Sequence, residues 1–139
     1  MNDSSQELPE PAFELADTAR ELKFRNSVSD WAIRAVFFVI FLYFGTAKLK
    51  GGADSPWGVI FGQIGLGQWF RYFTGVLECI GAFLVLVPGA VETGLAVLIT
   101  IAFAATISTV FLLHRLSEAF IPFALFCGMI AFWLHRRRV

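Results

Sequence analysis

Hydrophobic residues run in four long stretches along this chain, and short polar or turn-forming segments separate them. Each stretch is close to the roughly 20 apolar residues that a helix needs to cross a bilayer. The pattern therefore predicts an all-α membrane protein, a bundle of four transmembrane helices. The predicted helices lie at about 31–49, 69–87, 91–114 and 119–135.

The segment between the first two stretches has a different pattern. Residues 51–70 read GGADSPWGVIFGQIGLGQWF, with one charge, Asp54, and several aromatic residues. Glycine and proline interrupt this segment too often for a spanning helix. We expect an interfacial or re-entrant loop between helices 1 and 2, which lies over one mouth of the bundle and could act as a lid.

An acidic region, residues 1–30, precedes the first stretch. It has no basic start and no apolar run before Trp31, so we do not expect a cleaved signal peptide. Apolar residues after Pro11 recur at roughly helical spacing, which fits a short amphipathic helix, and the acidic composition fits a partly disordered tail equally well. The sequence thus divides into this tail and a membrane domain, 31–139.

The composition agrees with membrane insertion and excludes some partners. Hydrophobic residues make up 57% of the chain and the mean hydropathy is +0.68, which is more apolar than a soluble domain of this length. The formal net charge is zero, so no basic surface for nucleic acid is expected. The two cysteines, Cys79 and Cys127, form no CxxC pair, and we expect them to fill packing space.

The positive charges are distributed unevenly between the two sides of the predicted bundle. Cytoplasmic loops of membrane proteins carry an excess of lysine and arginine. The bias therefore places both termini in the cytoplasm, as an even number of spans requires. Seven of the eleven cations lie on the terminal side: Arg20, Lys23, Arg25, Arg34, Arg136, Arg137 and Arg138.

One carboxylate, Glu78, stands inside the second apolar stretch. An ionisable group at bilayer depth costs about 2.5–3.5 kcal/mol on insertion scales and survives mainly where it faces protein or water. On a helix, Glu78 shares a stripe with small residues, which let a neighbouring helix approach closely, while bulky residues occupy the opposite face. The carboxylate is therefore predicted to point into the bundle. The stripe comprises Arg71, Thr74, Gly75, Glu78, Gly81, Ala82 and Val85.

Further polar groups are expected near the same end of the bundle. Lys48 ends the first predicted helix, Arg71 begins the second and His114 ends the third. At a rise of about 1.5 Å per residue, Glu78 lies about 10 Å below Arg71. Tyr43 and Ser108 are expected at a similar depth. The candidate binding pocket comprises Glu78, Arg71, Lys48, Tyr43, Ser108 and His114.

Three interpretations of Glu78 stay open at this point. It could be a structural group, paired with Arg71 or Lys48, that holds the helices in register. It could exchange protons with a quinone-like or other small polar ligand. The small inward face and the lid could also form a pocket or path for a lipid or solute. A metal site is not expected, because the second histidine, His135, lies at the opposite membrane face.

Two motifs occur in the first two apolar stretches, a GxxKL element and an R-x-x-x-G-x-x-E-x-x-G element. The first motif comprises Gly45, Lys48 and Leu49, and the second comprises Arg71, Gly75, Glu78 and Gly81. Together and in this order the two are more specific than either alone. They resemble motifs of the DoxX and DoxX-like family of small four-helix membrane proteins, and the likeness covers about residues 31–135.

The resemblance implies a protein of the bacterial inner membrane that serves as an accessory membrane subunit of a redox system. The family takes its name from a membrane subunit of thiosulfate:quinone oxidoreductase, and some relatives are associated with oxidant defence. A quinone is the cofactor this implies, and an oxidoreductase is the implied partner. Apart from the resemblance, we expect membrane lipids and a second copy of the chain as further partners. Catalysis by the chain alone is not expected.

Two alternatives stay beside the redox interpretation. A related animal branch resembles a receptor-assembly chaperone, so the bundle could be a non-catalytic assembly factor or lipid-binding module, since fold does not fix function. The second alternative is a small proton-coupled solute transporter.

Overall fold

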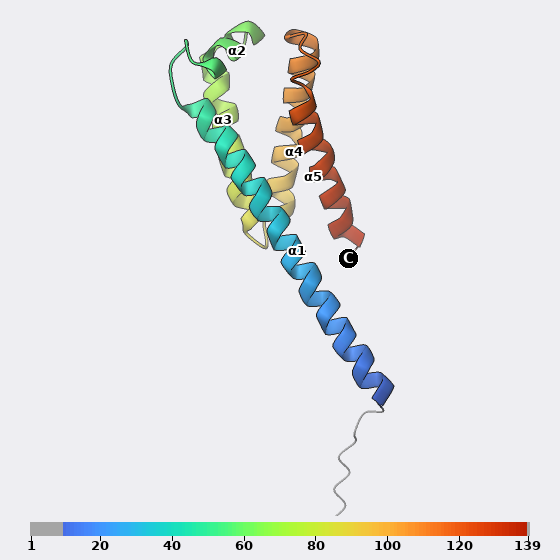
Figure 1. The fold of residues 1–139 in the computed structure, drawn as a ribbon. Coiled ribbons are helices and arrows are strands. Elements are labelled where there is room, and N and C mark those ends of the chain that lie inside the picture. Colours follow the sequence, from blue (N-terminus) through green and yellow to red (C-terminus); the bar gives the residue numbers. More distant parts are fainter. Residues whose placement is uncertain (1–9, 139) are drawn as a thin grey trace, which may run out of the picture. The chain divides into compact units, whose positions relative to one another are not determined.

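The computed structural model describes residues 10–138, with the side chains of residues 12–22 and 27–138. These residues form helices and no strand, which confirms the all-α class (Figure 1). Residues 1–9 of the predicted acidic tail lie outside the described residues. The elements are α1 (Glu10–Leu49), α2 (Pro56–Ile64), α3 (Gln68–Leu86), α4 (Val91–Ile107), η1 (Ser108–Leu112) and α5 (Phe120–Arg138).

Three helical segments are long and apolar enough to cross a membrane, namely Ala12–Leu49, Gln68–Leu86 and Val91–Leu112. They overlap the first three predicted spans, although the first segment begins at residue 12 and not at about 31. The fourth predicted span coincides with α5, which has 19 residues but ends in His135 and three arginines. These basic side chains lower its mean hydropathy, so the four-helix membrane bundle stays a prediction.

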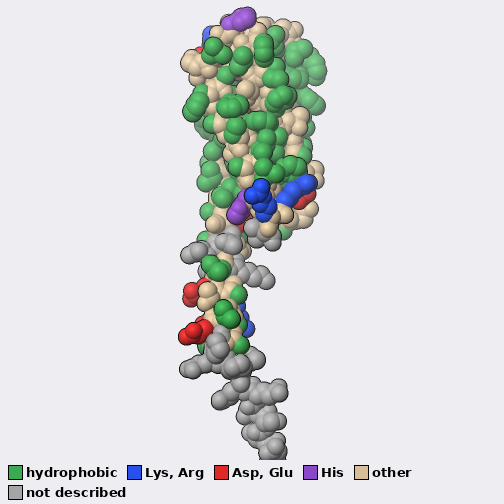
Figure 2. Space-filling model, turned by 90° about the vertical axis from the view of Figure 1, so that its right-hand side faces the viewer, with side chains coloured by type: hydrophobic (Ala, Val, Ile, Leu, Met, Phe, Trp, Pro, Cys, Tyr) green, Lys and Arg blue, Asp and Glu red, His purple; other side chains and the backbone are tan. Residues whose placement is uncertain are grey.

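The chain divides into two compact units, Met1–Ile33 and Arg34–Val139. The helical backbone of α1 begins at Glu10 and continues past residue 31, where the sequence predicted the first helix to start. In the second unit, hydrophobic side chains are spread along the face seen in Figure 2, and charged side chains gather at its two ends. This distribution fits a body that spans an apolar layer.

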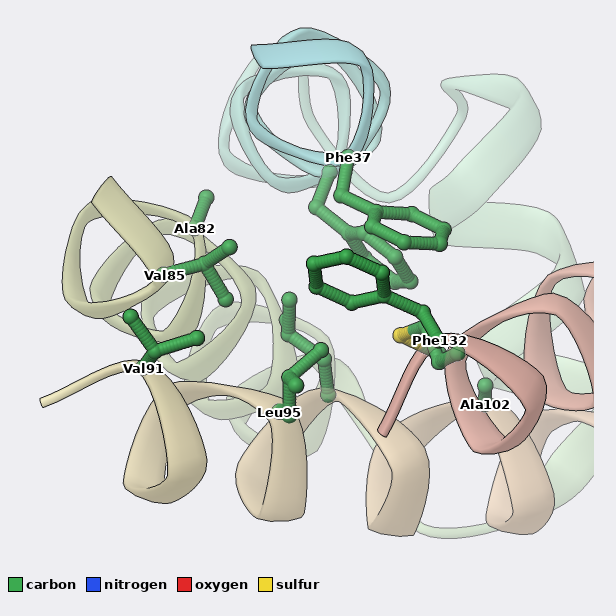
Figure 3. Close-up of a cluster of buried hydrophobic side chains, with 10 residues drawn as sticks. Phe37, Ala82, Val85, Val91, Leu95, Ala102 and Phe132 are labelled. Atoms are coloured by element: carbon green, nitrogen blue, oxygen red, sulfur yellow. The ribbon is translucent and has the colours of Figure 1, made fainter. Parts of the chain in front are cut away.

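The buried core of the second unit is formed by side chains from α1, α3, α4 and α5 (Figure 3). The rings of Phe37 in α1 and Phe132 in α5 lie 5.9 Å apart. Helices α3 and α4 approach closely near the turn that joins them, because a Cβ atom at Gly94 would lie 2.9 Å from the Gly81 carbonyl oxygen. The core residues are Phe37, Phe41, Ala82, Val85, Val91, Leu95, Leu98, Ala102, Met129 and Phe132.

The segment expected to be an interfacial loop contains the nine-residue helix α2. Its N-cap is Ser55, whose hydroxyl accepts a hydrogen bond from the Gly58 N–H. Pro56 occupies the first turn, where its missing N–H leaves no donor unpaired. Gly65 ends the helix in the left-handed conformation, with φ of 82°.

The third predicted helix, 91–114, differs from the structure at its end. Helix α4 stops at Ile107 and continues as the single π-helical turn η1. The Leu113 N–H donates to the Ser108 carbonyl five residues earlier, at 3.1 Å. His114 then adopts φ of 51°, a left-handed conformation that ends the helix.

Candidate functional site

The inward stripe predicted for the second apolar stretch matches the buried face of α3. Glu78 is 4% exposed, so the carboxylate points into the protein, as predicted. Phe73 and Phe83 on the opposite face are exposed. Six of the seven residues of the predicted stripe are buried: Arg71, Gly75, Glu78, Gly81, Ala82 and Val85.

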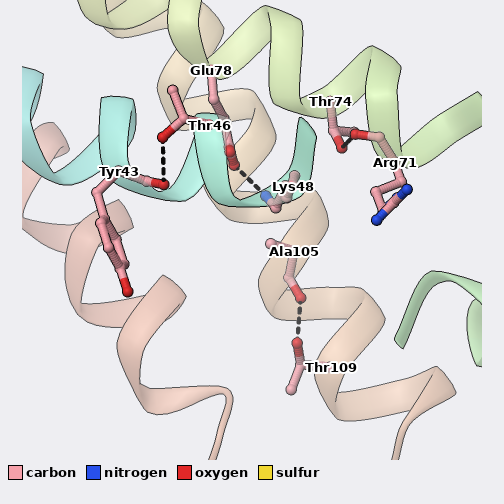
Figure 4. A network of polar contacts seen from close by, with 8 residues as sticks. All are labelled: Tyr43, Thr46, Lys48, Arg71, Thr74, Glu78, Ala105 and Thr109. Carbon is pink, nitrogen blue, oxygen red and sulfur yellow. Dashed lines mark hydrogen bonds and ion pairs between the residues drawn. The ribbon is translucent and has the colours of Figure 1, made fainter. Parts of the chain in front are cut away.

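Glu78 forms a buried ion pair with Lys48 of α1 (Figure 4). The Lys48 ammonium donates to Glu78 Oε1 at 2.5 Å. Two glycines allow this approach, since a Cβ atom at Gly75 would lie 3.0 Å from the Gly45 carbonyl oxygen and 3.2 Å from Lys48 Cβ. The glycines of the two motifs therefore let α1 and α3 pack closely enough for the lysine to reach the carboxylate.

The second carboxylate oxygen of Glu78, Oε2, is buried and has no hydrogen-bond partner among the described residues. A buried polar atom of this kind calls for an explanation, such as a bound molecule or a catalytic role. The Lys48 ammonium, which carries three donors, also lies 5.1 Å from the centre of the Trp57 ring in α2.

Glu78 lines a cavity of about 350 Å³, here called the central cavity. Its walls come from α1, α2, α3, α4, η1 and α5, and most of them are apolar. The volume is within the range of small-molecule sites, which are largely apolar with a few placed polar groups. The lining includes Phe41, Phe44, Lys48, Trp57, Ile60, Glu78, Ala102, Ala105, Thr109, Leu113, Glu118, Ile121 and Leu125.

Arg71 is 0% exposed. It binds the connection between α1 and α2, whereas the sequence had left Glu78 open as its partner. Its guanidinium donates to the Ser55 hydroxyl at 2.9 Å, to the Gly51 carbonyl at 3.0 Å and to the Tyr72 hydroxyl at 2.7 Å. Arginine suits this position because its planar group presents several donors in fixed directions. Arg71 thus fixes the segment that carries α2 and its cavity-lining residues.

The structure brings only part of the predicted pocket together. Tyr43 is 68% exposed, and its ring extends away from the ion pair in Figure 4. Five residues separate it from Lys48, which turns it by about 140° around a helix, so similar depth does not place the two on one face. Ser108 lines a second cavity, described below. His114 is exposed and lines neither cavity.

Of the residues in the central cavity, only Glu78 and Lys48 belong to the predicted pocket, and Trp57 and Thr109 are among those that the sequence did not identify. Trp57 belongs to the aromatic linking segment, and this aromatic content was the one available signal. Thr109 lies in η1, and its hydroxyl donates to the Ala105 carbonyl at 2.8 Å. Nothing in the local sequence marks a π-helical turn, although such turns are frequent at functional sites.

Among the side chains that the structure describes, those of residues 12–22 and 27–138, no group of three or more histidine, cysteine or acidic residues could hold a metal ion. Comparisons of the chain with protein families, with curated proteins and with solved structures found no match. The resemblance to the DoxX family therefore rests on the motif residues alone.

Proposed function

We propose that this protein binds a quinone-type molecule in the central cavity and serves as an accessory membrane subunit of a redox system. Two observations carry the proposal: Glu78 lines an apolar cavity, and its Oε2 has no hydrogen-bond partner among the described residues. A quinone has an apolar ring that carries hydrogen-bonding groups, so it matches the central cavity in both polarity and size. We place the protein in the bacterial inner membrane with both termini cytoplasmic.

The ion pair offers a partner to both redox forms of such a ligand. A quinol carries hydroxyl groups, which can donate to the Glu78 carboxylate, an acceptor. A quinone carries carbonyl groups, which can accept from the Lys48 ammonium. Since both charges lie in the same buried site, the oxidised and reduced forms can each be held without leaving the cavity.

The redox role and the oxidoreductase partner come from the family resemblance. The chain would hold the quinone in the membrane while the partner supplies or removes electrons. Affinity purification of the tagged protein from its native membrane tests this part. An oxidoreductase should be recovered with the wild-type protein. Recovery of a receptor or another membrane protein without redox activity would favour the assembly-factor alternative.

Binding of decylubiquinone to the purified protein in phosphatidylcholine nanodiscs tests the ligand. We expect Glu78→Gln to weaken binding about tenfold or more, because a hydrogen bond to a charged group contributes about 1.5–3 kcal/mol. Glu92→Gln is the matched control, since Glu92 is exposed at the start of α4 and lines neither cavity.

Equal affinity of wild type and Glu78→Gln would contradict the proposal, as would the absence of any binding to wild type. If phospholipid, rather than decylubiquinone, occupies the cavity, the lipid-binding alternative gains support. Uptake of a solute into vesicles that depends on Glu78 would instead favour the transporter.

A further inference from the structure

A second cavity of about 280 Å³, here called the lateral cavity, adjoins the central cavity. The two share several lining residues, among them Lys48, Trp57 and Thr109. Glu78 lines the central cavity and does not line the lateral one. Among the described residues of the lateral lining, Lys48 is the one ionisable side chain, and large apolar groups from α2 and α3 make up much of the wall. The polar end of the combined space therefore lies at Glu78, and the apolar end lies under α2.

Several side chains of α3 and α4 that line the lateral cavity are also exposed. Phe73 on α3, and Thr100 and Ala104 on α4, line this cavity and are also exposed. All three lie within segments apolar and long enough to cross a membrane. Their exposed sides would thus meet acyl chains, not water.

The side chains along α4 differ between the part near the turn and the part that lines the lateral cavity. Near the turn, Gly81 and Gly94 allow α3 and α4 to touch. Toward the other end of α4, small side chains such as Ala104 and Ala105 face the lateral cavity and leave its space unfilled. The space of the lateral cavity therefore depends on the packing of α3 against α4.

We propose that the lateral cavity holds the apolar tail of the ligand and is the opening through which the ligand passes from the bilayer. This inference rests on the proposed function, because it requires that Glu78 binds the head group of the same ligand. It narrows the ligand class to a molecule dissolved in the membrane, with a compact hydrogen-bonding head and a prenyl or alkyl tail. A water-soluble solute would have no use for an opening toward acyl chains.

The test compares two probes in phosphatidylcholine nanodiscs: decylubiquinone, which has a tail, and 2,3-dimethoxy-5-methyl-1,4-benzoquinone, which has the head alone. Ala104→Trp fills the opening. We expect it to weaken decylubiquinone binding at least tenfold and to leave the affinity for the head compound within about twofold. Ala96→Trp is the matched control, because Ala96 is exposed about 12 Å further along α4 and lines neither cavity.

Unchanged decylubiquinone binding by Ala104→Trp overturns the inference, and so does equal loss of both probes. If that variant does not fold, Thr100→Trp at the same opening replaces it, with the same expected results. The proposed function fails separately, when the wild-type protein binds neither probe. If wild type binds both probes and Ala104→Trp changes neither affinity, the proposed function stands and the proposed role of the lateral cavity is wrong.

Discussion

At the scale of single residues, the Lys48–Glu78 ion pair is a buried polar contact of the second unit. Both side chains are buried, and they join α1 to α3. Removing one partner of a buried pair leaves an uncompensated charge and typically costs about 3–5 kcal/mol. Replacing both partners by apolar residues of similar size is often neutral or stabilising. A structural role and a binding role can therefore be separated by mutation.

We expect Lys48→Met to lower the free energy of unfolding by about 3–5 kcal/mol, and the double variant Lys48→Met/Glu78→Leu to recover most of that loss. Denaturant titration in detergent measures both. The double variant should nevertheless fail to bind decylubiquinone, because the acceptor at the cavity wall is gone. If it binds as wild type does, the pair serves packing alone.

A matched control is the exposed ion pair between Arg115 and Glu118, whose nearest atoms lie 3.1 Å apart. Exposed pairs contribute about 0–1 kcal/mol. Arg115→Met/Glu118→Leu should therefore leave the unfolding free energy within about 1 kcal/mol of wild type.

At the scale of the elements, the glycines decide how closely the helices pack. Gly45 in α1 faces α3, where an added Cβ atom would lie 2.7 Å from Cys79 Sγ and 2.9 Å from the Gly75 carbonyl oxygen. The backbone atom cannot move without displacing α3. The ion pair one turn further along α1 depends on the same close approach.

We expect Gly45→Ala to destabilise the protein by about 1–3 kcal/mol, as overpacking of a close contact does. Gly62→Ala is the matched control, because Gly62 lies in α2 with nothing within 4 Å of the added atom. That change should be neutral or stabilise by up to about 1 kcal/mol, since alanine favours helix. Thermal unfolding of the two variants in one detergent makes the comparison, and equal melting temperatures would contradict the close-packing argument.

At the scale of the whole molecule, the number of spans fixes where the termini lie. Three segments are long and apolar enough to cross a membrane, and α5 carries its basic residues in the last turn. Four spans place both termini on one side, whereas three place them on opposite sides. The charge distribution favours four spans. The connection between η1 and α5 then lies on the side of the membrane away from the cytoplasm.

Reporter fusions check this topology. Green fluorescent protein fused at either end should fluoresce, because it folds in the cytoplasm, and alkaline phosphatase fused after Ser117 should be active. An active phosphatase fused after Val139 would show that α5 does not cross the membrane. The cavities would then still lie in the second unit, but the proposed orientation of the C-terminus would be lost.

The sequence alone determined the helical class, the inward face of α3 and the burial of Glu78. These follow from local rules: apolar runs set helix length, and a period of 3.6 residues sorts side chains onto faces. A carboxylate among small residues on such a face has one stable direction to point. The same rules placed Lys48 and Glu78 near the same end of the bundle. They did not decide whether Lys48 or Arg71 is the ion-pair partner of Glu78.

Only the tertiary structure decided which groups meet. Depth along a helix says nothing about rotation around it, so Tyr43 was expected in the pocket although its side chain is exposed. Arg71 was an equal candidate for Glu78 until the α1–α2 connection supplied it with oxygen acceptors. The cavities themselves depend on the π-helical turn η1 and on how far α3 and α4 separate, which are properties of packed helices and not of any one segment.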